Sequence, residues 1–570
     1  MSTHARPLAV WLAAADDAQL SALFEARGVR DDVAWTDFFD AAEALLDPAS
    51  IERMLPQLTL AEAGALSRAV SGGDAGDEFE HLLSLGLLRP DGTPAPPVAD
   101  AVTSRVPLIA VEAAESAPSS EAATARAAER AFTSVGAIAD LLLMTADAPM
   151  ALLTDGRLAA GERRRIAESG APTDALDDLI AVAGDAGLVT IDERRLRMTP
   201  AGEAWLRQSA PDRWSALADG FRAALPRGVR TASGGWLPVP GWEHQHPWDT
   251  SWSDRCASFR TRGRLLGLIA DDGTEPEWAV APRRGAAADA TAVARMLPTE
   301  VDRIFLQNDL SAIAPGPLQS ALDVRLRRIA VRESAAQASS YRFTNESVAH
   351  ALTTGETAES ILSFLGGISL TGIPQPLEYL VMQSAARHGL VRVRADEASG
   401  RTRITSTDTT LLDAMSVDQS LRPLALARDA EGVSSRVGRD SVYWTLTDAR
   451  YPAMLVGSDG LPLVVDRHPT PLPAPSRVPD YAPLIQRLRD RQGPDADAAW
   501  LDRELEAAVR AKSLLQVEIL MPDGTIRELQ LEASGLGGGR LRGRDRAADV
   551  ERTLPVRSIR SAHVIDPSTA

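Results

Sequence analysis

The sequence predicts a multidomain α+β protein with tandem winged-helix-like helical domains, a central α/β domain and a small C-terminal β-barrel or roll. Its length of 570 residues is enough for about four domains. The composition is globular, with 45% hydrophobic and 24% charged residues. Helical periodicity dominates the first part of the chain, and short strand patterns become frequent from Val301 onward.

Residues 1–112 are expected to form an acidic, helical, winged-helix-like domain. Its apolar start runs into Leu20, Leu23 and Phe24, which continue a helical period and so favour an amphipathic helix over a secretion signal. Residues 1–130 contain 9 arginines and 21 acidic residues, a balance of −12. This part of the chain should therefore repel phosphate.

Residues 113–226 predict the clearer winged-helix domain. Helix signals at 137–144, 161–168 and 173–186 are followed by Gly187, a residue type that commonly ends helices. A two-stranded ribbon pattern comes next. Short helices followed by such a ribbon are the layout of a winged helix.

The remaining segments differ in composition. Residues 227–300 are rich in Gly, Pro, Trp and Arg, which is typical of a connector without regular structure. Residues 301–467 combine strand and helix signals and are expected to form the central α/β domain. The proline-rich stretch 468–480 predicts a stiff linker, and residues 481–570 predict a helical pair followed by the β domain.

Lysine is almost absent from the chain, and this scarcity excludes the functions that need a P-loop. Arginine accounts for 59 of the 60 basic residues, and Lys512 is the one lysine. A P-loop requires a lysine behind a glycine-rich turn, but Glu506 and Ala511 occupy the positions of the two glycines. We therefore expect no helicase motor. No closed set of four metal ligands and no nucleophile motif is present in the sequence, so we also expect no catalytic residue, no metal and no cofactor, and the protein is predicted not to be an enzyme.

Cysteine content and hydropathy indicate the compartment. Cys256 is the single cysteine, which excludes a disulfide framework and favours a reducing cytoplasm. The apolar stretches are shorter than the roughly 20 residues that a membrane span needs, so no membrane partner is expected. The net charge of −18 argues against a general nucleic-acid coat.

Several motifs between Ile304 and Leu424 carry a resemblance to a known family. They read Phe305-Leu-Gln307-Asn-Asp309, Tyr341-Arg-Phe-Thr344 and Ile373-Pro-Gln375-Pro-Leu-Glu378-Tyr-Leu380. This region is similar to the non-motor N-terminal domain of XPB-type DNA helicases. The whole chain resembles bacterial helicase-associated proteins that carry this domain without the motor. The resemblance implies a role in DNA repair or transcription, with an XPB-type helicase or the transcription machinery as a partner.

The C-terminal residues 501–570 resemble a WYL-type domain, a small β fold linked to regulatory sensing. The final Thr553-Leu-Pro-Val-Arg557 fits that pattern. The Trp-Tyr-Leu triplet that gives the domain its name is absent, and Arg540-Leu541-Arg542 stands in its neighbourhood. The resemblance therefore implies a degenerate, WYL-like domain.

Three arginine groups and two tryptophans are the candidate nucleic-acid contacts. They are Arg163, Arg164 and Arg165 on the winged helix, Arg194, Arg195 and Arg197 on its wing, Arg540, Arg542 and Arg544 near the C-terminus, and Trp242 and Trp248 in the connector. Arginine pairs with phosphate in a fork geometry, and tryptophan faces stack on unpaired bases. The alternatives are solvated surface arginines and tryptophans packed between domains. Asp177 and Asp178 on the same winged helix argue against base reading by that helix.

Together these features predict a non-catalytic, cytoplasmic, DNA-binding protein. It is expected to be a helicase-associated scaffold that contacts DNA with low specificity. The alternative is a protein–protein adaptor, which would dock a helicase or a transcription complex through the XPB-like and acidic N-terminal domains without DNA contact.

Overall fold

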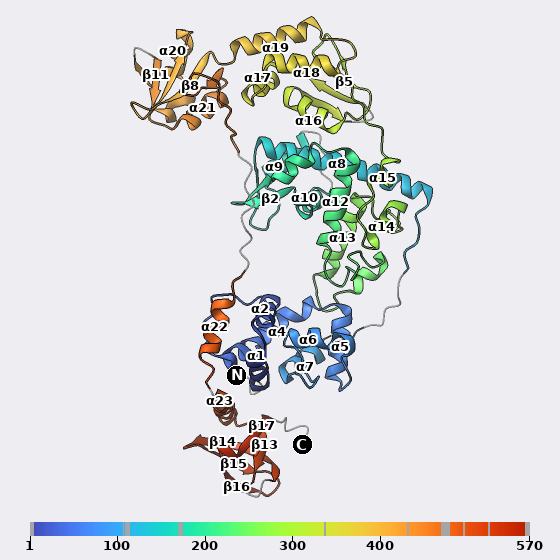
Figure 1. Cartoon of the computed structure of the whole chain (residues 1–570), viewed down its shortest axis with the longest axis vertical. Coiled ribbons are helices and arrows are strands. Elements are labelled where there is room, and N and C mark those ends of the chain that lie inside the picture. The colour runs from blue at the N-terminus through green and yellow to red at the C-terminus, as the bar shows by residue number, and fades with distance from the viewer. Residues whose placement is uncertain are drawn as a thin grey trace.

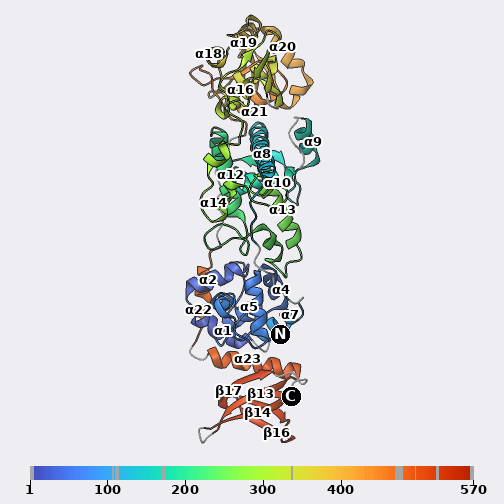
Figure 2. The ribbon, with the colours of Figure 1, turned by 90° about the vertical axis from the view of Figure 1, so that its right-hand side faces the viewer.

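The structure is an elongated, mixed α+β multidomain protein (Figure 1). A computed structural model describes residues 5–105, 108, 115–168, 175–335, 338–429, 432–468, 479–493, 496–521 and 525–564. Most of the expected linker at 468–480 and the start of the helix expected at 173–186 lie outside these ranges. The described residues form five hydrophobic clusters. The cores that contain α18 and α20 lie at one end of the long axis, and the C-terminal sheet lies at the other (Figure 2).

The N-terminal module is helical. Its main helices are α1 (Ala5–Ala14), α2 (Asp17–Ala26), α3 (Phe38–Leu45), α4 (Pro48–Met54), α5 (Leu60–Val70), α6 (Phe79–Ser84) and α7 (Pro96–Thr103). Side-chain caps define where they begin: Asp16 caps α2, and Thr59 with Glu62 forms a capping box on α5. Extended pairing among the described residues of this module is limited to one bridge, between Leu88 and Pro94.

A helix from the last fifth of the chain completes the core of this N-terminal module. Helix α22 (Ala482–Asp490) places Leu484, Ile485 and Leu488 in the same cluster as α1–α7. The Tyr481 ring meets Phe24 edge to face with their centroids 5.8 Å apart, and its hydroxyl donates a 2.7 Å hydrogen bond to a backbone carbonyl of the N-terminal module. The expected unit 481–570 therefore divides in space, because α22 packs with residues far from it in sequence.

The adjoining helix α23 (Ala496–Ala511) joins the N-terminal module to the C-terminal sheet. Trp500 packs in the N-terminal cluster, whereas Leu501 and Leu505 pack against the sheet. The Arg503 guanidinium lies 3.0 Å from a carboxylate oxygen of Asp37 and 2.7 Å from one of Asp40. One helix thus fixes the two modules to each other.

The C-terminal sheet is antiparallel with the order β16-β15-β14-β13-β17. Its strands are β13 (Leu514–Leu520), β14 (Ile526–Gly537), β15 (Arg540–Asp545), β16 (Val550–Pro555) and β17 (Ile559–Val564). Between its two edge strands, β16 and β17, no pairing occurs in the described residues. This part of the chain is therefore a five-stranded sheet covered by α23 on one face.

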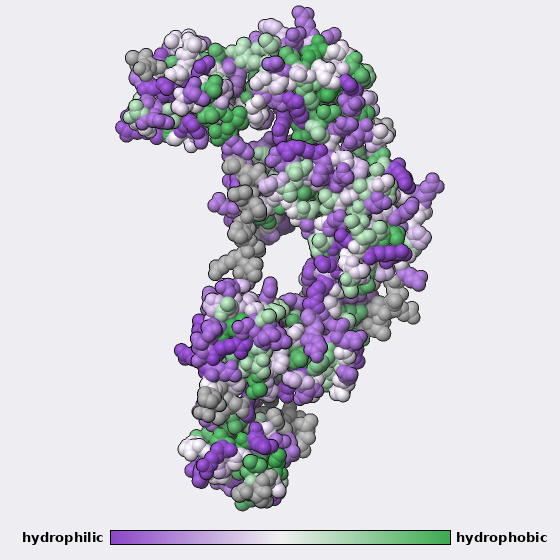
Figure 3. All heavy atoms as spheres, viewed as in Figure 1, coloured by the Kyte–Doolittle hydropathy of each residue, from purple (hydrophilic) through white to green (hydrophobic). Residues whose placement is uncertain are grey.

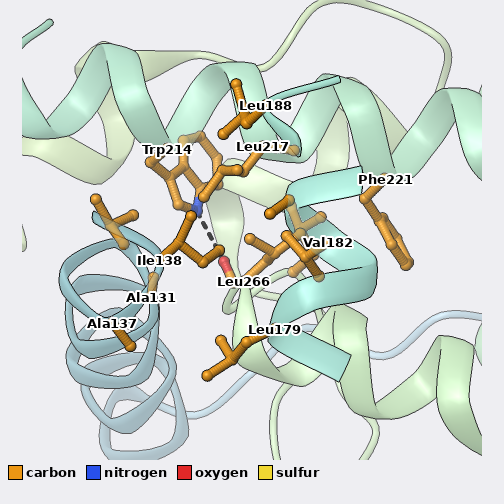
Figure 4. Packing of buried hydrophobic residues seen from close by; sticks show 14 of the residues in the cluster. Ala131, Ala137, Ile138, Leu179, Val182, Leu188, Trp214, Leu217, Phe221 and Leu266 are labelled. Atoms are coloured by element: carbon orange, nitrogen blue, oxygen red, sulfur yellow. Dashed lines mark hydrogen bonds between the residues drawn. The ribbon is translucent and has the colours of Figure 1, made fainter. Parts of the chain in front are cut away.

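The middle module is built on the long helix α8 and a small sheet in the order β1-β3-β2. Its elements are α8 (Glu121–Asp147), β1 (Met150–Ala151), α9 (Ala160–Glu168), α10 (Leu176–Asp185), β2 (Val189–Asp192), β3 (Arg195–Met198), α11 (Pro200–Trp205), α12 (Ala210–Ala224), α13 (Trp252–Leu265), α14 (Val280–Arg283) and α15 (Ala290–Ala294). The indole N–H of Trp214 donates a 2.7 Å hydrogen bond to the Leu266 carbonyl inside its core (Figure 4).

The expectation of an irregular connector at 227–300 is wrong. Its segment contributes α13 to the middle module, and Trp236, Trp242, Trp252 and Trp278 are all buried in that module's core. Glycine and proline do break this stretch into short pieces. The apolar area of four indole rings nevertheless holds it in place.

Residues 301–467 contain two cores rather than one. The first has a sheet in the order β4-β5-β7-β6 and the second a sheet in the order β10-β11-β9-β8-β12. The first comprises β4 (Phe305–Leu306), β5 (Ser311–Ala314), α16 (Ser320–Ile329), β6 (Val331–Ala335), β7 (Ser339–Arg342), α17 (Asn345–Thr353), α18 (Ala358–Ile368) and α19 (Gln375–Arg387). The second comprises β8 (Val391–Asp396), β9 (Arg401–Ser406), α20 (Thr409–Val417), β10 (Ala427–Asp429), β11 (Gly432–Ser435), α21 (Arg439–Asp448) and β12 (Ala453–Leu455).

Ion pairs that involve buried carboxylates hold neighbouring modules together. Asp140 on α8 is 8% exposed, and its two carboxylate oxygens accept hydrogen bonds from Arg327 and Arg332 of the α16–β6 region. Between the N-terminal and middle modules, buried Glu62 pairs with Arg227. The modules are therefore tied by contacts that are costly to break.

In the described part of the chain, none of the helices is both long enough and apolar enough to cross a bilayer.

Replacing Tyr481 by alanine should lower the free energy of unfolding of the N-terminal module by about 3 kcal/mol, because a buried ring and its hydrogen bond are lost. Tyr379→Ala is the matched control, since Tyr379 is 66% exposed. Urea unfolding monitored by circular dichroism measures both variants. Equal stabilities would show that α22 is not part of the N-terminal core.

Replacing Asp140 by asparagine should destabilise the junction between the middle module and α16 by about 3 kcal/mol, because two arginines lose their buried carboxylate. Limited proteolysis of the segment between α15 and β4 provides the measurement. Glu129→Gln on the same helix is the control, because Glu129 is exposed. Identical cleavage rates in the two variants would contradict the fastening role.

Candidate nucleic-acid interface

The structure brings the first two arginine groups together on one side of the middle module. Strand β1 pairs with β3, which places Ala151 opposite Arg195. The Ala151 amide also donates a 3.2 Å hydrogen bond to Glu162 at the start of α9. Helix α9 and the β2–β3 ribbon are therefore neighbours.

Half of this combined group is neutralised by carboxylates. Three of its arginines are paired: Arg163 with Asp177, Arg165 with Glu162 and Arg197 with Asp192. Arg164 and Arg195 are exposed, and no described carboxylate lies within ion-pair distance of them. Arg194, also exposed, has a positive φ of 61° and directs its guanidinium toward the Leu152 carbonyl, 3.4 Å away.

Helix α10 cannot enter a DNA groove in this arrangement. It packs against α8, α12 and α13, and of its residues only Asp177 and Gly184 are exposed. A Cβ on Gly220 of α12 would lie 2.6 Å from the backbone directly after α10, so the helices touch closely. At the same end, burial raises the pKa of Asp185, which pairs with Arg262 at 2.7 Å. The helix is a packing element.

Burial removes both candidate tryptophans from the interface. Trp242 is 0% exposed and Trp248 is 5% exposed, so neither ring offers a face to a base. The Trp242 indole N–H donates a 2.7 Å hydrogen bond to the Leu237 carbonyl. Trp248 lies in the core of the N-terminal module. Both rings serve packing: Trp242 lies within the core of the middle module and Trp248 within that of the N-terminal module.

The adjacent His246 also serves packing. Its two ring nitrogens lie 3.1 Å from the Leu58 carbonyl oxygen and 3.2 Å from that of Arg227. The ring thus spans the contact between the N-terminal and middle modules. Among the described residues, no three histidine, cysteine or carboxylate side chains gather as metal ligands would.

The C-terminal group lies on one face of β15. Arg540, Arg542 and Arg544 are exposed and alternate with buried residues along the strand. Arg544 is paired with Asp549 at 2.7 Å. Across the sheet, the cross-strand neighbours of the other two arginines are glycine, proline and threonine: Gly537 and Pro555 for Arg540, Gly535 and Thr553 for Arg542. Arg540 and Arg542 therefore present charge that no described carboxylate neutralises.

The β15 group and the α9–wing group do not converge. They belong to different modules, and the N-terminal module lies between them along the axis (Figure 1). The acidic N-terminal module, with its balance of −12 over residues 1–130, thus separates two basic surfaces.

The structure adds one arginine pair that the sequence reading did not single out. Arg392 and Arg394 alternate with buried Val391 and Val393 on β8, and both are exposed. The alternation Val-Arg-Val-Arg is visible in the sequence, and it is the signal that could have found them.

Comparison with protein families identifies one part of the chain. Residues 304–430 match the family described as helicase conserved C-terminal domain. This part of the chain is similar to that helicase domain. The match covers the β4–β7 core and runs into the β8–β12 core as far as β10. No curated protein matches the chain.

Proposed function

We propose that this helicase-related chain is a non-catalytic accessory protein in DNA repair or transcription, a scaffold without a motor of its own. In this proposal residues 301–467 act as an XPB-N-terminal-like docking module. DNA is contacted through the sugar–phosphate backbone with low sequence specificity. The observation that carries the DNA contact is the uncompensated arginine pair on β15.

The scaffold role is supported by the way in which the modules are joined. Asp140 joins α8 to the α16–β6 region, Glu62 joins the N-terminal module to the middle module, and Arg503 on α23 binds Asp37 of the N-terminal module. Interfaces held by buried or shared ions keep a fixed geometry. Such a chain can hold a partner at one end and DNA at another.

Backbone contact is favoured over base reading. The order β1-β3-β2, with α8, α9 and α10 before the ribbon, supports the proposal that this module is a winged helix. Because α10 is covered, we propose that this module contacts DNA only through exposed arginines such as Arg164 and Arg195. Phosphate contacts position a protein without specifying sequence.

The surroundings of Lys512 support a partner-supplied motor. A P-loop lysine sits between a strand and the helix that follows it. Lys512 comes after α23 and directly before β13, which is the reverse order. We therefore assign ATP hydrolysis to another protein.

A second candidate, the adaptor without DNA contact, is favoured by an apolar surface on the helicase-related module. Tyr379 and Met382 on α19 are 66% and 53% exposed, and Leu370 in the preceding loop is 55% exposed. Figure 3 shows apolar side chains on the surface of this module. Exposed aromatic and Met side chains are typical of protein interfaces. In this alternative, α19 and the acidic N-terminal module dock a helicase or a transcription complex.

For the scaffold, the double variant Arg540→Gln/Arg542→Gln should weaken binding to a random-sequence duplex about tenfold at low salt. It should also reduce the dependence of log affinity on log salt by about 2, because two phosphate contacts are lost. Fluorescence anisotropy over a salt series measures both quantities. The control is Arg163→Gln/Arg207→Gln, which removes two arginines already paired with Asp177 and Glu203. Equal losses in both variants would contradict the β15 contact.

For the adaptor, Tyr379→Ser/Met382→Ser should weaken binding to a purified XPB-type helicase at least about tenfold, as loss of a central aromatic anchor does. Isothermal titration calorimetry gives the affinity. Val417→Ser is the matched control, because Val417 is 80% exposed on a different element. Unchanged affinity of the double variant would exclude α19 as the docking surface.

A further inference from the structure

The sheet of the β8–β12 core has one covered face and one open face. Val391, Val393 and Ile404 point into the core, where α20 and α21 cover them. The residues between them point the other way. On two of the three interior strands, β8 and β9, this open face carries Arg392, Arg394, Arg401 and Arg403.

Two of these arginines face each other across the strands. In the antiparallel register Arg394 is directly opposite Arg403, and Arg392 is opposite Thr405. Like charges at opposed cross-strand positions destabilise a sheet. Arginine on an edge strand can serve to block aggregation, but β8 and β9 are interior strands. Neither sheet stability nor edge protection explains this placement.

Carboxylates compensate only one end of the open face. Arg403 lies 3.1 Å from Asp429 and 3.5 Å from Asp396. Asp396 is held in the β8–β9 turn, where it accepts a 2.7 Å hydrogen bond from the Ser399 hydroxyl, and this bond lowers the pKa of Asp396. Arg392 and Arg394 have no described carboxylate within ion-pair distance.

The same arrangement occurs on β15. There, too, an interior strand exposes two arginines spaced two residues apart, and their register neighbours carry no carboxylate. Arginines at such positions lie about 7 Å apart on one face. The β8 and β15 pairs lie toward opposite ends of the molecule (Figure 1).

We infer that the open face of β8 and β9 is a second surface that binds the phosphate backbone of nucleic acid, with Arg392 and Arg394 as its contacts. This inference rests on the proposed DNA-binding function and adds a site to it. The guanidinium fork matches phosphate oxygens in pairs. The strands on this face, β8, β9, β11 and β12, contain no aromatic residue, so bases are not stacked there. Binding is therefore independent of sequence.

The test compares Arg392→Gln/Arg394→Gln with Arg540→Gln/Arg542→Gln and with wild type, using the full chain and a labelled random-sequence duplex. The control is Arg422→Gln/Arg450→Gln, which removes the same charge from two exposed positions outside the strands of the same core, one in the short helical turn Gln419–Leu424 and one just after α21. We expect the β8 variant to lose about tenfold in affinity at low salt and about 2 in the salt slope, and the control to lose neither. The affinity losses of the β8 and β15 variants should add as free energies in the quadruple variant that carries all four substitutions.

Other outcomes separate the two proposals. Wild-type affinity in the β8 variant, together with a loss in the β15 variant, overturns this inference and leaves the proposed function intact. An absence of duplex binding by wild type overturns both. Binding to vesicles of anionic phospholipid that depends on Arg392 and Arg394, with unchanged duplex binding, assigns the face to lipid headgroups and also overturns the inference. Should the glutamine variant unfold, Arg392→Lys/Arg394→Lys keeps the charge and should lose less than threefold in affinity.

Discussion

The packing of α22 into the N-terminal module is the contact on which the rest of the arrangement depends. The chain forms its N-terminal module first, then the middle module and the two cores of residues 301–467. It then returns to the N-terminal module, where α22 packs. The Tyr481 ring and the Arg489 side chain, which donates to the Ala15 carbonyl at 2.6 Å, secure this return. Because α23 follows directly, the C-terminal sheet is held by the same contact.

Charge has two separate uses in this molecule. Asp140 and Glu62 are nearly inaccessible to solvent. Their carboxylates neutralise arginines at the boundaries between modules and so hold the modules together. Other arginines, on β8 and β15, remain in water without a carboxylate partner. The net charge of the whole chain is −18. The basic character of these two surfaces therefore comes from where their arginines lie and not from an excess of basic residues. This separation fits the proposed binding of an anionic polymer at these places.

Local sequence patterns predicted much of the fold, and non-local packing accounts for what they missed. The multidomain α+β class and the ribbon after Gly187 follow from periodicity and helix-ending residues. The buried role of Trp242 does not, because a tryptophan beside glycine and proline gives no sign of which core will receive it. The α22 contact joins residues more than 450 positions apart, and no window of sequence contains such information. The ion pair between Arg163 and Asp177 could not be predicted either, because neutralisation of the Arg163 charge depends on the distance between the two side chains in space.

The return of the chain to its first module has a consequence for synthesis on the ribosome. The first hundred residues leave the exit tunnel long before residues 481–490 are made, and until then Phe24 lacks the ring that covers it. Translation at about 5–20 residues per second leaves this gap open for at least about 20 seconds. During that interval the core of the nascent N-terminal module lacks Leu484, Ile485 and Leu488, and the apolar side chains that they cover stay in contact with water.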